Sequence, residues 1–270
     1  MSFGPLVDGE WLAEHHDSVR IVDVRWYLGG PPGWDGYVEG HIPGAVFLDV
    51  DTDLSAPATA AAGRHPLPSP AQFAAALGRV GIADGQPVVA YDDRGGSTAS
   101  RLWWLLHVLG EPVAVLDGGL AAWRSELSRE VPLFAPVERQ PRLWPAEAFV
   151  DADTVATTVL PVLDARTADR YERGDPAVDP RPGHIPGARN APWAANLDSG
   201  TGRFLPPEAL RAAYAARGVT DAAIAYCGSG VTACHDLLAL TIAGVPDLRL
   251  YAGSWSQWAA DPDRPAEPGA

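Results

Sequence analysis

The chain has 270 residues, of which 47% are hydrophobic and 20% charged, and this composition is typical of a globular protein. A net charge of −14, with no basic run, argues against a nucleic-acid partner, because phosphate recognition needs concentrated cations. All 20 basic positions are arginine. Without lysine, the sequence excludes mechanisms that need a Schiff-base lysine, a pyridoxal phosphate anchor or a phosphate-loop lysine.

Targeting and redox features point to a cytoplasmic location. No stretch approaches the roughly 20 consecutive apolar residues of a membrane span, and the first residues have neither a basic patch nor an apolar run of signal-peptide length. The two cysteines, Cys227 and Cys234, lie too close in sequence to form a disulfide framework. We therefore expect a protein of a reducing compartment with no membrane partner.

The two halves of the chain carry the same landmarks in the same order, which indicates a duplicated domain. The segments around Asp92 and Cys227 correspond at an offset of 135 residues. The same offset superposes Gly118 and Trp123 on Gly253 and Trp258. The recurring landmarks are Asp23-Val24-Arg25 with Asp164-Ala165-Arg166, Gly40-His41-Ile42-Pro43-Gly44-Ala45 with Gly183-His184-Ile185-Pro186-Gly187-Ala188, and the segments that begin at Tyr91 and Tyr226.

Within each copy, β-rich runs alternate with helical patterns, and such β-α-β alternation implies a parallel sheet covered by helices. The predicted fold class is therefore α/β, with tandem domains that are each a small parallel sheet flanked by helices. Strands are predicted at 87–91, 112–116, 222–226 and 248–251, and helices at about 98–109, 206–217 and 231–243. The predicted domains are 1–128 and 146–262, with a proline-interrupted linker at 129–145 and a flexible tail at 263–270.

Cys227 is the candidate nucleophile because it follows a predicted strand and precedes a predicted helix, where open α/β folds place their ligands. Gly228 and Gly230 let the backbone curl so that successive N–H groups form an anion-binding nest at the positive end of the helix dipole. Such a nest stabilises a thiolate relative to the thiol. The alternative, a small buried apolar residue, is the ordinary role of a free cysteine, and we assign it to Cys234 inside the helical pattern.

The duplicated layout, the paired Gly-His-Ile-Pro-Gly-Ala motifs and the loop Cys-Gly-Ser-Gly-Val-Thr-Ala resemble the rhodanese superfamily, and the two-domain sulfurtransferases within it, over nearly the whole chain. The resemblance implies an inactive first copy and a second copy whose cysteine carries sulfur as a persulfide. Asp92 stands at the position of the cysteine in the first copy, and a carboxylate cannot form a persulfide.

The residues after Cys227 resemble the 3-mercaptopyruvate branch of the family. Members that use thiosulfate, a dianion, carry two cations after the cysteine, whereas this chain has Gly228 and Ser229. The resemblance implies that Ser229, Asp51 and His65 assist with the proton of the donor thiol. Asp49 is an alternative to Asp51, and the segment around His65 is equally a candidate for an ordinary surface loop.

Carboxylate recognition favours arginine, whose planar fork can bind both oxygens. The resemblance implies two arginines from the second copy, and the matching positions are Arg170 and Arg181, although the spacing of Arg181 departs from the family pattern. The predicted contacts of the substrate further include the loop residues Gly228, Gly230, Val231 and Thr232.

Residues that appear in both copies are predicted to be structural, because one copy lacks the cysteine. Arg25 and Arg166 follow the aspartates at the strand ends and are expected to form ion pairs. His41 and His184 are expected to order the loops of their motifs.

The predicted function is a sulfurtransferase that moves sulfane sulfur from 3-mercaptopyruvate through a Cys227 persulfide to a thiol, thioredoxin or cyanide acceptor. No cofactor and no metal are expected. The alternatives are a thiosulfate sulfurtransferase and a non-catalytic persulfide carrier or binding module. A phosphatase needs an arginine six positions after the cysteine, and that position holds Ala233.

Overall fold

The computed structural model describes residues 3–268, which form two compact units. The first unit comprises the chain up to Ala56, Leu67–Trp144 and Ser199–Phe204. The second comprises Pro57–Pro66, Pro145–Asp198 and the chain from Leu205 onward. Each unit thus receives one short segment from the part of the sequence that mainly builds the other, and His65 belongs to the second unit.

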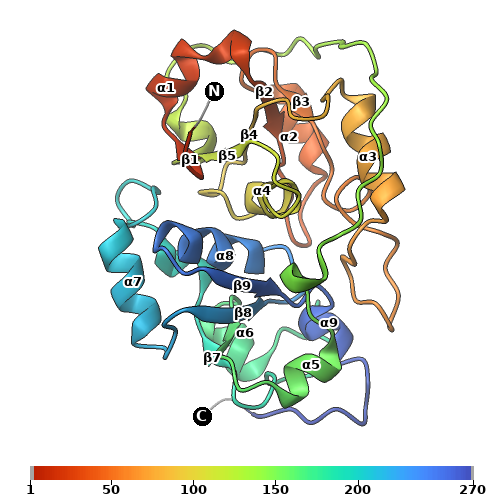
Figure 1. The fold of residues 1–270 in the computed structure, drawn as a ribbon, viewed down its shortest axis with the longest axis vertical. Helices are drawn as coiled ribbons and strands as arrows, with labels where there is room; N and C mark the ends of the chain where they lie inside the picture. The colour runs from red at the N-terminus through yellow and green to blue at the C-terminus, as the bar shows by residue number, and fades with distance from the viewer. Residues whose placement is uncertain (1–2, 269–270) are drawn as a thin grey trace. The chain divides into compact units, whose positions relative to one another are not determined.

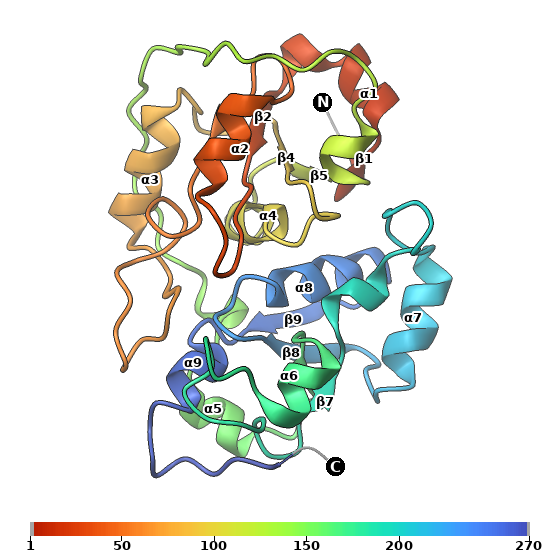
Figure 2. The same ribbon diagram turned by 180° about the vertical axis from the view of Figure 1, so that it is seen from behind.

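The first unit is built on a parallel sheet with the strand order β1-β5-β4-β2-β3. Helices α1 and α4 lie on opposite sides of this sheet (Figures 1 and 2). Its strands are β1 (Leu6–Val7), β2 (Arg20–Asp23), β3 (Val46–Phe47), β4 (Val88–Tyr91) and β5 (Val113–Leu116). Its helices are α1 (Gly9–Glu14), η1 (His16–Ser18), α2 (Gly33–Glu39), α3 (Pro70–Arg79), α4 (Ala99–His107) and η2 (Gly119–Ala122).

The second unit is built on a parallel sheet with the order β7-β6-β8-β9. Helix α8 lies on one side of this sheet, and α5, α6 and α9 lie on the other (Figures 1 and 2). Its strands are β6 (Val162–Asp164), β7 (Arg189–Asn190), β8 (Ala222–Tyr226) and β9 (Asp247–Leu250). Its helices are η3 (Ala146–Ala148), α5 (Ala152–Thr157), α6 (Ala168–Arg173), η4 (Trp193–Asn196), α7 (Pro207–Ala215), α8 (Ala233–Ile242) and α9 (Ser254–Trp258).

The connections of the second sheet place a topological switch point between β6 and β8. The chain passes from β6 outward to β7 on one side, and from β8 outward to β9 on the other. Helices that cover such a sheet leave a crevice at the carboxyl ends of the two central strands, which is where open α/β folds bind ligands. Asp164 ends β6 and Tyr226 ends β8, so the residues that follow them share this edge.

The predicted α/β fold is confirmed, with small differences at the ends of the elements. The strand predicted at 222–226 coincides with β8, and the strand predicted at 87–91 begins one residue later. The helix predicted at 231–243 begins at Ala233, because residues 227–232 form the loop that precedes it. Burial explains the strands: the Val88–Tyr91 side chains are all buried, as expected for a strand covered on both faces.

The segments predicted as a linker and a tail make specific contacts. Nε2 of His41 lies 3.1 Å from the carbonyl oxygen of Glu130, and Val137 N–H donates to the carbonyl of Gly78. Near the end of the chain, Glu267 exchanges two backbone hydrogen bonds with His184. Both stretches therefore lack helices and strands yet are anchored through their backbones, and positions 269–270 of the predicted tail lie outside the described residues.

A buried polar network lies at the side of α8. Nδ2 of Asn196 donates to Oδ1 of Asp236 at 2.8 Å, and the hydroxyl of Tyr214 donates to Oδ1 of Asn196 at 2.9 Å. Burial raises the pKa of Asp236 to about 8, although the hydrogen bond from Asn196 opposes this shift. The carboxyl of Asp236 is therefore mostly protonated at neutral pH.

Asp236→Asn should make the stability of the protein less dependent on pH. The unfolded carboxyl ionises near pH 3.9, whereas the folded one holds its proton up to about pH 8. The wild type therefore loses stability as the pH rises between these values, and the amide variant does not. Urea unfolding at about pH 5.5 and about pH 8.5 should show the variant gaining about 3 kcal/mol relative to the wild type at the higher pH. An equal change of stability with pH in both proteins would contradict a protonated carboxyl at Asp236.

Candidate active site

Cys227 lies directly after β8, at the carboxyl edge of the second sheet. Its backbone is held from two sides: its N–H donates to Oγ of Ser254 at 3.2 Å, and its carbonyl accepts the N–H of Trp255 at 3.0 Å. Both Ser254 and Trp255 belong to α9. Only 2% of Cys227 is exposed, and it is a free thiol, as is the buried Cys234.

Backbone N–H groups of the loop point at the sulfur of Cys227. The N–H of Gly230 lies 3.1 Å from Sγ and that of Ser229 lies 3.5 Å from it. Gly230 has a φ of +79°, and a Cβ there would lie 2.6 Å from the carbonyl oxygen of Ala252, so only glycine fits. Within residues 3–268, no hydrogen-bond acceptor is found for the N–H groups of Val231 and Thr232. The loop thus offers donors to an anion larger than the sulfur.

In the first unit, the loop equivalent to that of Cys227 surrounds a carboxylate, that of Asp92. The carboxylate of Asp92 accepts backbone N–H groups from residues two, four, six and seven positions further along. The distances lie between 2.7 and 2.9 Å. The duplicated backbone is therefore an anion-binding nest in the copy where its occupant can be seen directly. The donors are Arg94, Gly96, Thr98 and Ala99.

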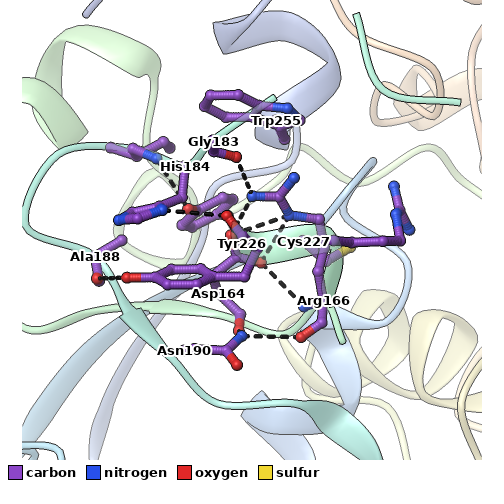
Figure 3. A network of polar contacts seen from close by, with 12 residues as sticks. Asp164, Arg166, Gly183, His184, Ala188, Asn190, Tyr226, Cys227 and Trp255 are labelled. Atoms are coloured by element: carbon purple, nitrogen blue, oxygen red, sulfur yellow. Dashed lines mark hydrogen bonds and ion pairs between the residues drawn. The ribbon is translucent and has the colours of Figure 1, made fainter. Parts of the chain in front are cut away.

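A buried ion pair supports the loop from the end of β6. Nε and Nη2 of Arg166 lie 3.0 and 2.7 Å from Oδ2 of Asp164, and Nη2 also donates to the carbonyl of Gly183 at 2.9 Å (Figure 3). Burial disfavours the cation of Arg166, but the carboxylate of Asp164 outweighs it, so the pKa of Arg166 lies above its ordinary value. Asp23 and Arg25 form the same pair in the first unit. The predicted ion pairs of both arginines are confirmed.

The histidines of the repeated motif also occupy equivalent places. His184 stacks on Tyr171 with ring centroids 3.7 Å apart, and Nδ1 contacts the Tyr171 carbonyl at 3.2 Å. His41 stacks on Tyr37 at 4.0 Å and contacts the Tyr37 carbonyl at 2.8 Å. Both histidines therefore join the motif to the preceding helix, as predicted from their duplication. In Figure 3, His184 lies to the left of Tyr226, on the side away from Cys227.

His65 reaches the loop from the segment that joins the second unit. Nδ1 of His65 lies 2.7 Å from Oγ of Ser229, and both residues are buried. The segment is fixed by its backbone: Arg64 N–H donates to Oγ of Ser256 at 3.0 Å, and the carbonyl of Ala61 accepts from Nε2 of Gln257 at 2.6 Å. The structure thus brings together two residues that are 164 positions apart in the sequence.

Asp51 and Asp49 lie in the first unit. Oδ2 of Asp51 accepts a hydrogen bond from Nε1 of Trp26 at 3.0 Å. The carboxylate of Asp49 accepts the N–H groups of Asp51 and Thr52, so it caps its own turn. The part predicted for Asp51 in proton transfer therefore stays a prediction.

Two guanidinium groups face Gly228. A Cβ on Gly228 would lie 2.8 Å from Nη2 of Arg170 and 2.8 Å from Nη2 of Arg64. Arg170 also forms a two-point ion pair with the buried carboxylate of Asp179, in which Nε lies 3.0 Å from Oδ2. Arg170 is therefore placed beside the loop as predicted from the sequence, and Arg64 joins it.

Arg181 is placed elsewhere. Its Nη2 donates to the backbone carbonyls of Asp261 and Arg264, and its guanidinium lies 5.9 Å from the ring of Trp255. The prediction that Arg181 faces the loop with Arg170 is therefore not matched by this geometry, because the C-terminal segment supplies acceptors that hold the side chain. The second guanidinium beside Gly228 is that of Arg64.

Sequence reasoning missed Arg64 and Ser254. Ser254 has a φ of 52°, an uncommon conformation for a residue with a side chain, and its hydroxyl accepts the N–H of Cys227. The repeat contained a signal for Ser254: the residue 135 positions earlier is Gly119, with a φ of 58°. Arg64 stood next to the predicted His65, but nothing in the sequence showed where its side chain would point.

Within residues 3–268, no cluster of three or more His, Cys, Asp or Glu side chains could hold a metal ion. In the same part of the chain, no helix combines the length and apolar character needed to cross a membrane.

The chain belongs to the rhodanese family, because the family model described as a rhodanese-like domain matches residues 8–126 and again residues 147–261. A Pseudomonas aeruginosa protein provisionally named 3-mercaptopyruvate sulfurtransferase is 45% identical over 285 residues, which cover 100% of both chains. A Mycobacterium tuberculosis protein provisionally named thiosulfate sulfurtransferase SseB is 40% identical, over 92% of this chain and 90% of its own length.

The crystal structure of SseA from Escherichia coli, described as showing the rhodanese fold and the catalytic mechanism of 3-mercaptopyruvate sulfotransferases, superposes with a TM-score of 0.83. It is 35% identical, and the match covers 94% of this chain and 99% of that one. The predicted family is therefore confirmed.

Proposed function

We propose that this protein is a sulfurtransferase that takes the sulfur of 3-mercaptopyruvate onto Cys227 and passes it to a thiol, thioredoxin or cyanide acceptor. The observation that carries the proposal is the position of Cys227 Sγ in a nest of N–H groups, beside the Ser229 and His65 pair. The names of two relatives, from P. aeruginosa and E. coli, support the choice of donor. Two free thiols suit a reducing compartment, which supports the cytoplasmic location.

In the proposed reaction, the thiolate of Cys227 attacks the donor sulfur and forms the S–S bond. The C–S bond of the donor breaks, and its electron pair goes to the carbon, which gives the enolate of pyruvate. The proton of the donor thiol passes through Ser229 and His65 to this carbon. The products are pyruvate and the Cys227 persulfide anion, and an acceptor then removes the outer sulfur.

The charges around the loop favour a monoanionic donor over thiosulfate. Arg64 and Arg170 bring two positive charges, and Asp179 and the thiolate bring two negative ones. A donor with one carboxylate adds one negative charge to this balanced set, whereas thiosulfate adds two. Because Cys227 and Asp179 are buried, charges beside them interact more strongly than in bulk water, and the second charge should cost about 1.4 kcal/mol, or about tenfold in efficiency.

The proposal is tested by comparing the two donors with cyanide as acceptor. We expect kcat/KM for 3-mercaptopyruvate to exceed that for thiosulfate by about tenfold or more. The second candidate, thiosulfate sulfurtransferase, is favoured by the name of the M. tuberculosis relative and would reverse this order. A protein that gains one sulfur atom by intact mass but never turns over would be a persulfide carrier. A protein that gains no sulfur atom from either donor would refute the sulfurtransferase and the carrier alike.

Ser229→Ala should slow transfer from 3-mercaptopyruvate by about 10²-fold, the lower end for loss of a positioned proton-transfer group. Thiosulfate has no thiol proton to move, so its transfer should change little. Steady-state kinetics of the variant with both donors measure this difference. An equal loss with both donors would show that Ser229 instead supports the loop, and no loss with either would remove it from the reaction.

A further inference from the structure

Arg64 is held at the Cys227 loop by backbone contacts of its own segment. Gly63 has a φ of +90°, and a Cβ there would lie 2.6 Å from the carbonyl oxygen of Gly253, so the segment lies in close contact with the start of α9. The next N–H, that of Arg64, donates to Oγ of Ser256. The side chain therefore starts from a fixed point and turns its guanidinium toward Gly228.

The two guanidinium groups at Gly228 differ in what they already bind. Nε and Nη2 of Arg170 are engaged by the carboxylate of Asp179. Nη1 of Arg64 donates to the carbonyl of Val178, and no ion pair with a carboxylate is found for Arg64 among residues 3–268. Nε of Arg64 is buried without a hydrogen-bond partner in the same part of the chain. The Nε and Nη2 edge of Arg64 thus has the geometry to hold both oxygens of a carboxylate.

The environment of Arg64 disfavours the positive charge of its guanidinium. Burial lowers the pKa of Arg64, and the neighbouring cation of Arg170 lowers it further, against the opposing effects of Cys227 and Asp179. A bound carboxylate would compensate both effects. A cavity of about 490 Å³ lies against Arg64, and Gly63, Val178, Asp179 and Ser256 also line it. A small anion can therefore approach this guanidinium.

We propose that Arg64 is the specificity-determining residue that binds the carboxylate of the donor, and that Asp179, by neutralising Arg170, limits the site to one further negative charge. This inference rests on the proposed function. It assigns to a residue of the segment 57–66 the role that the sequence suggested for Arg181.

The test compares 3-mercaptopyruvate with 1-mercaptopropan-2-one, in which a methyl group replaces the carboxylate. Arg64→Gln should raise KM for 3-mercaptopyruvate by about 10- to 100-fold, the usual range for a charge-assisted hydrogen-bonded pair, and leave kcat/KM for the neutral donor within about twofold. Arg64→Lys should lie between the wild type and the glutamine variant, because lysine keeps the charge but loses the fork. Asp179→Asn should raise the efficiency of thiosulfate relative to 3-mercaptopyruvate by about tenfold.

The matched control is Arg173→Gln, an exposed arginine of α6 that should change neither donor. Equal losses with both donors in Arg64→Gln would mean that Arg64 supports the loop and would overturn the inference. A selective rise in KM from Arg181→Gln, with none from Arg64→Gln, would overturn it as well. If the wild type itself takes no sulfur from 3-mercaptopyruvate, the proposed function fails; if it does and Arg64→Gln is unchanged, only this inference fails.

Discussion

Cys227→Ser should abolish sulfur transfer, with a fall in kcat on the order of 10⁴-fold or more, as for removal of other catalytic nucleophiles. Serine preserves the size of the side chain and leaves the N–H groups of Ser229 and Gly230 in place. A hydroxyl, however, is a far weaker nucleophile at neutral pH and cannot hold sulfur as a persulfide. Cyanide-coupled turnover and intact mass after treatment with 3-mercaptopyruvate measure the two losses independently.

The other cysteine provides the control for this experiment. Cys234 is fully buried in α8, and its Sγ lies 3.4 Å from the carbonyl of Gly230. Cys234→Ala should therefore retain both the mass increase and turnover. Turnover by Cys227→Ser, or loss of labelling in Cys234→Ala alone, would show that Cys227 is not the nucleophile.

Asp164→Ala should lower the free energy of unfolding of the second unit by about 3–5 kcal/mol. Arg166, a residue that is 2% exposed, would lose its carboxylate partner, and an arginine cannot shed its charge by deprotonation. The nearest remaining carboxylate, that of Asp179, lies 3.9 Å from Nη1. Calorimetry of the variant and the wild type should show the loss as a lowered transition for the second unit.

A double variant separates the ion pair from the packing. Asp164→Ala with Arg166→Met removes both charges, so it should be more stable than Asp164→Ala alone. Asp23→Ala is the matched change in the first unit and should lower the transition of that unit instead. A double variant no more stable than the single one would show that the cost comes from lost packing rather than from the uncompensated charge.

Much of the fold was predictable because the sequence contains two copies of the same pattern of strands, helices and motifs. The strand that ends at Tyr226 follows from a short apolar run, and the ion pair of Asp164 with Arg166 follows from a motif repeated in the first copy. Each of these features depends on residues close together in the chain. Local patterns are what periodicity and turn chemistry can report.

From the pattern of the sequence alone, without the family resemblance, the site was predictable only within one loop. Cys227, Ser229 and the glycines belong to one loop, and the sequence placed them together correctly. The contact of His65 with Ser229 joins distant segments, and resemblance rather than pattern suggested it. The choice between Arg64 and Arg181 depends on which backbone carbonyls each side chain meets, and no sequence pattern encodes that.

The carboxylate of Asp92 shows how far a side chain at this position of the duplicated loop must extend to meet the N–H donors. An aspartate oxygen stands two bonds from Cβ, whereas the sulfur of Cys227 stands one bond away and contacts the N–H groups of Ser229 and Gly230. The outer sulfur of a persulfide would also stand two bonds from Cβ, and so would reach further into the loop than Sγ does, as the oxygens of Asp92 do in the first copy. The loop of the first copy thus always surrounds an anion, the carboxylate of Asp92. The loop of the second copy would surround a comparable anion only while Cys227 carries a persulfide.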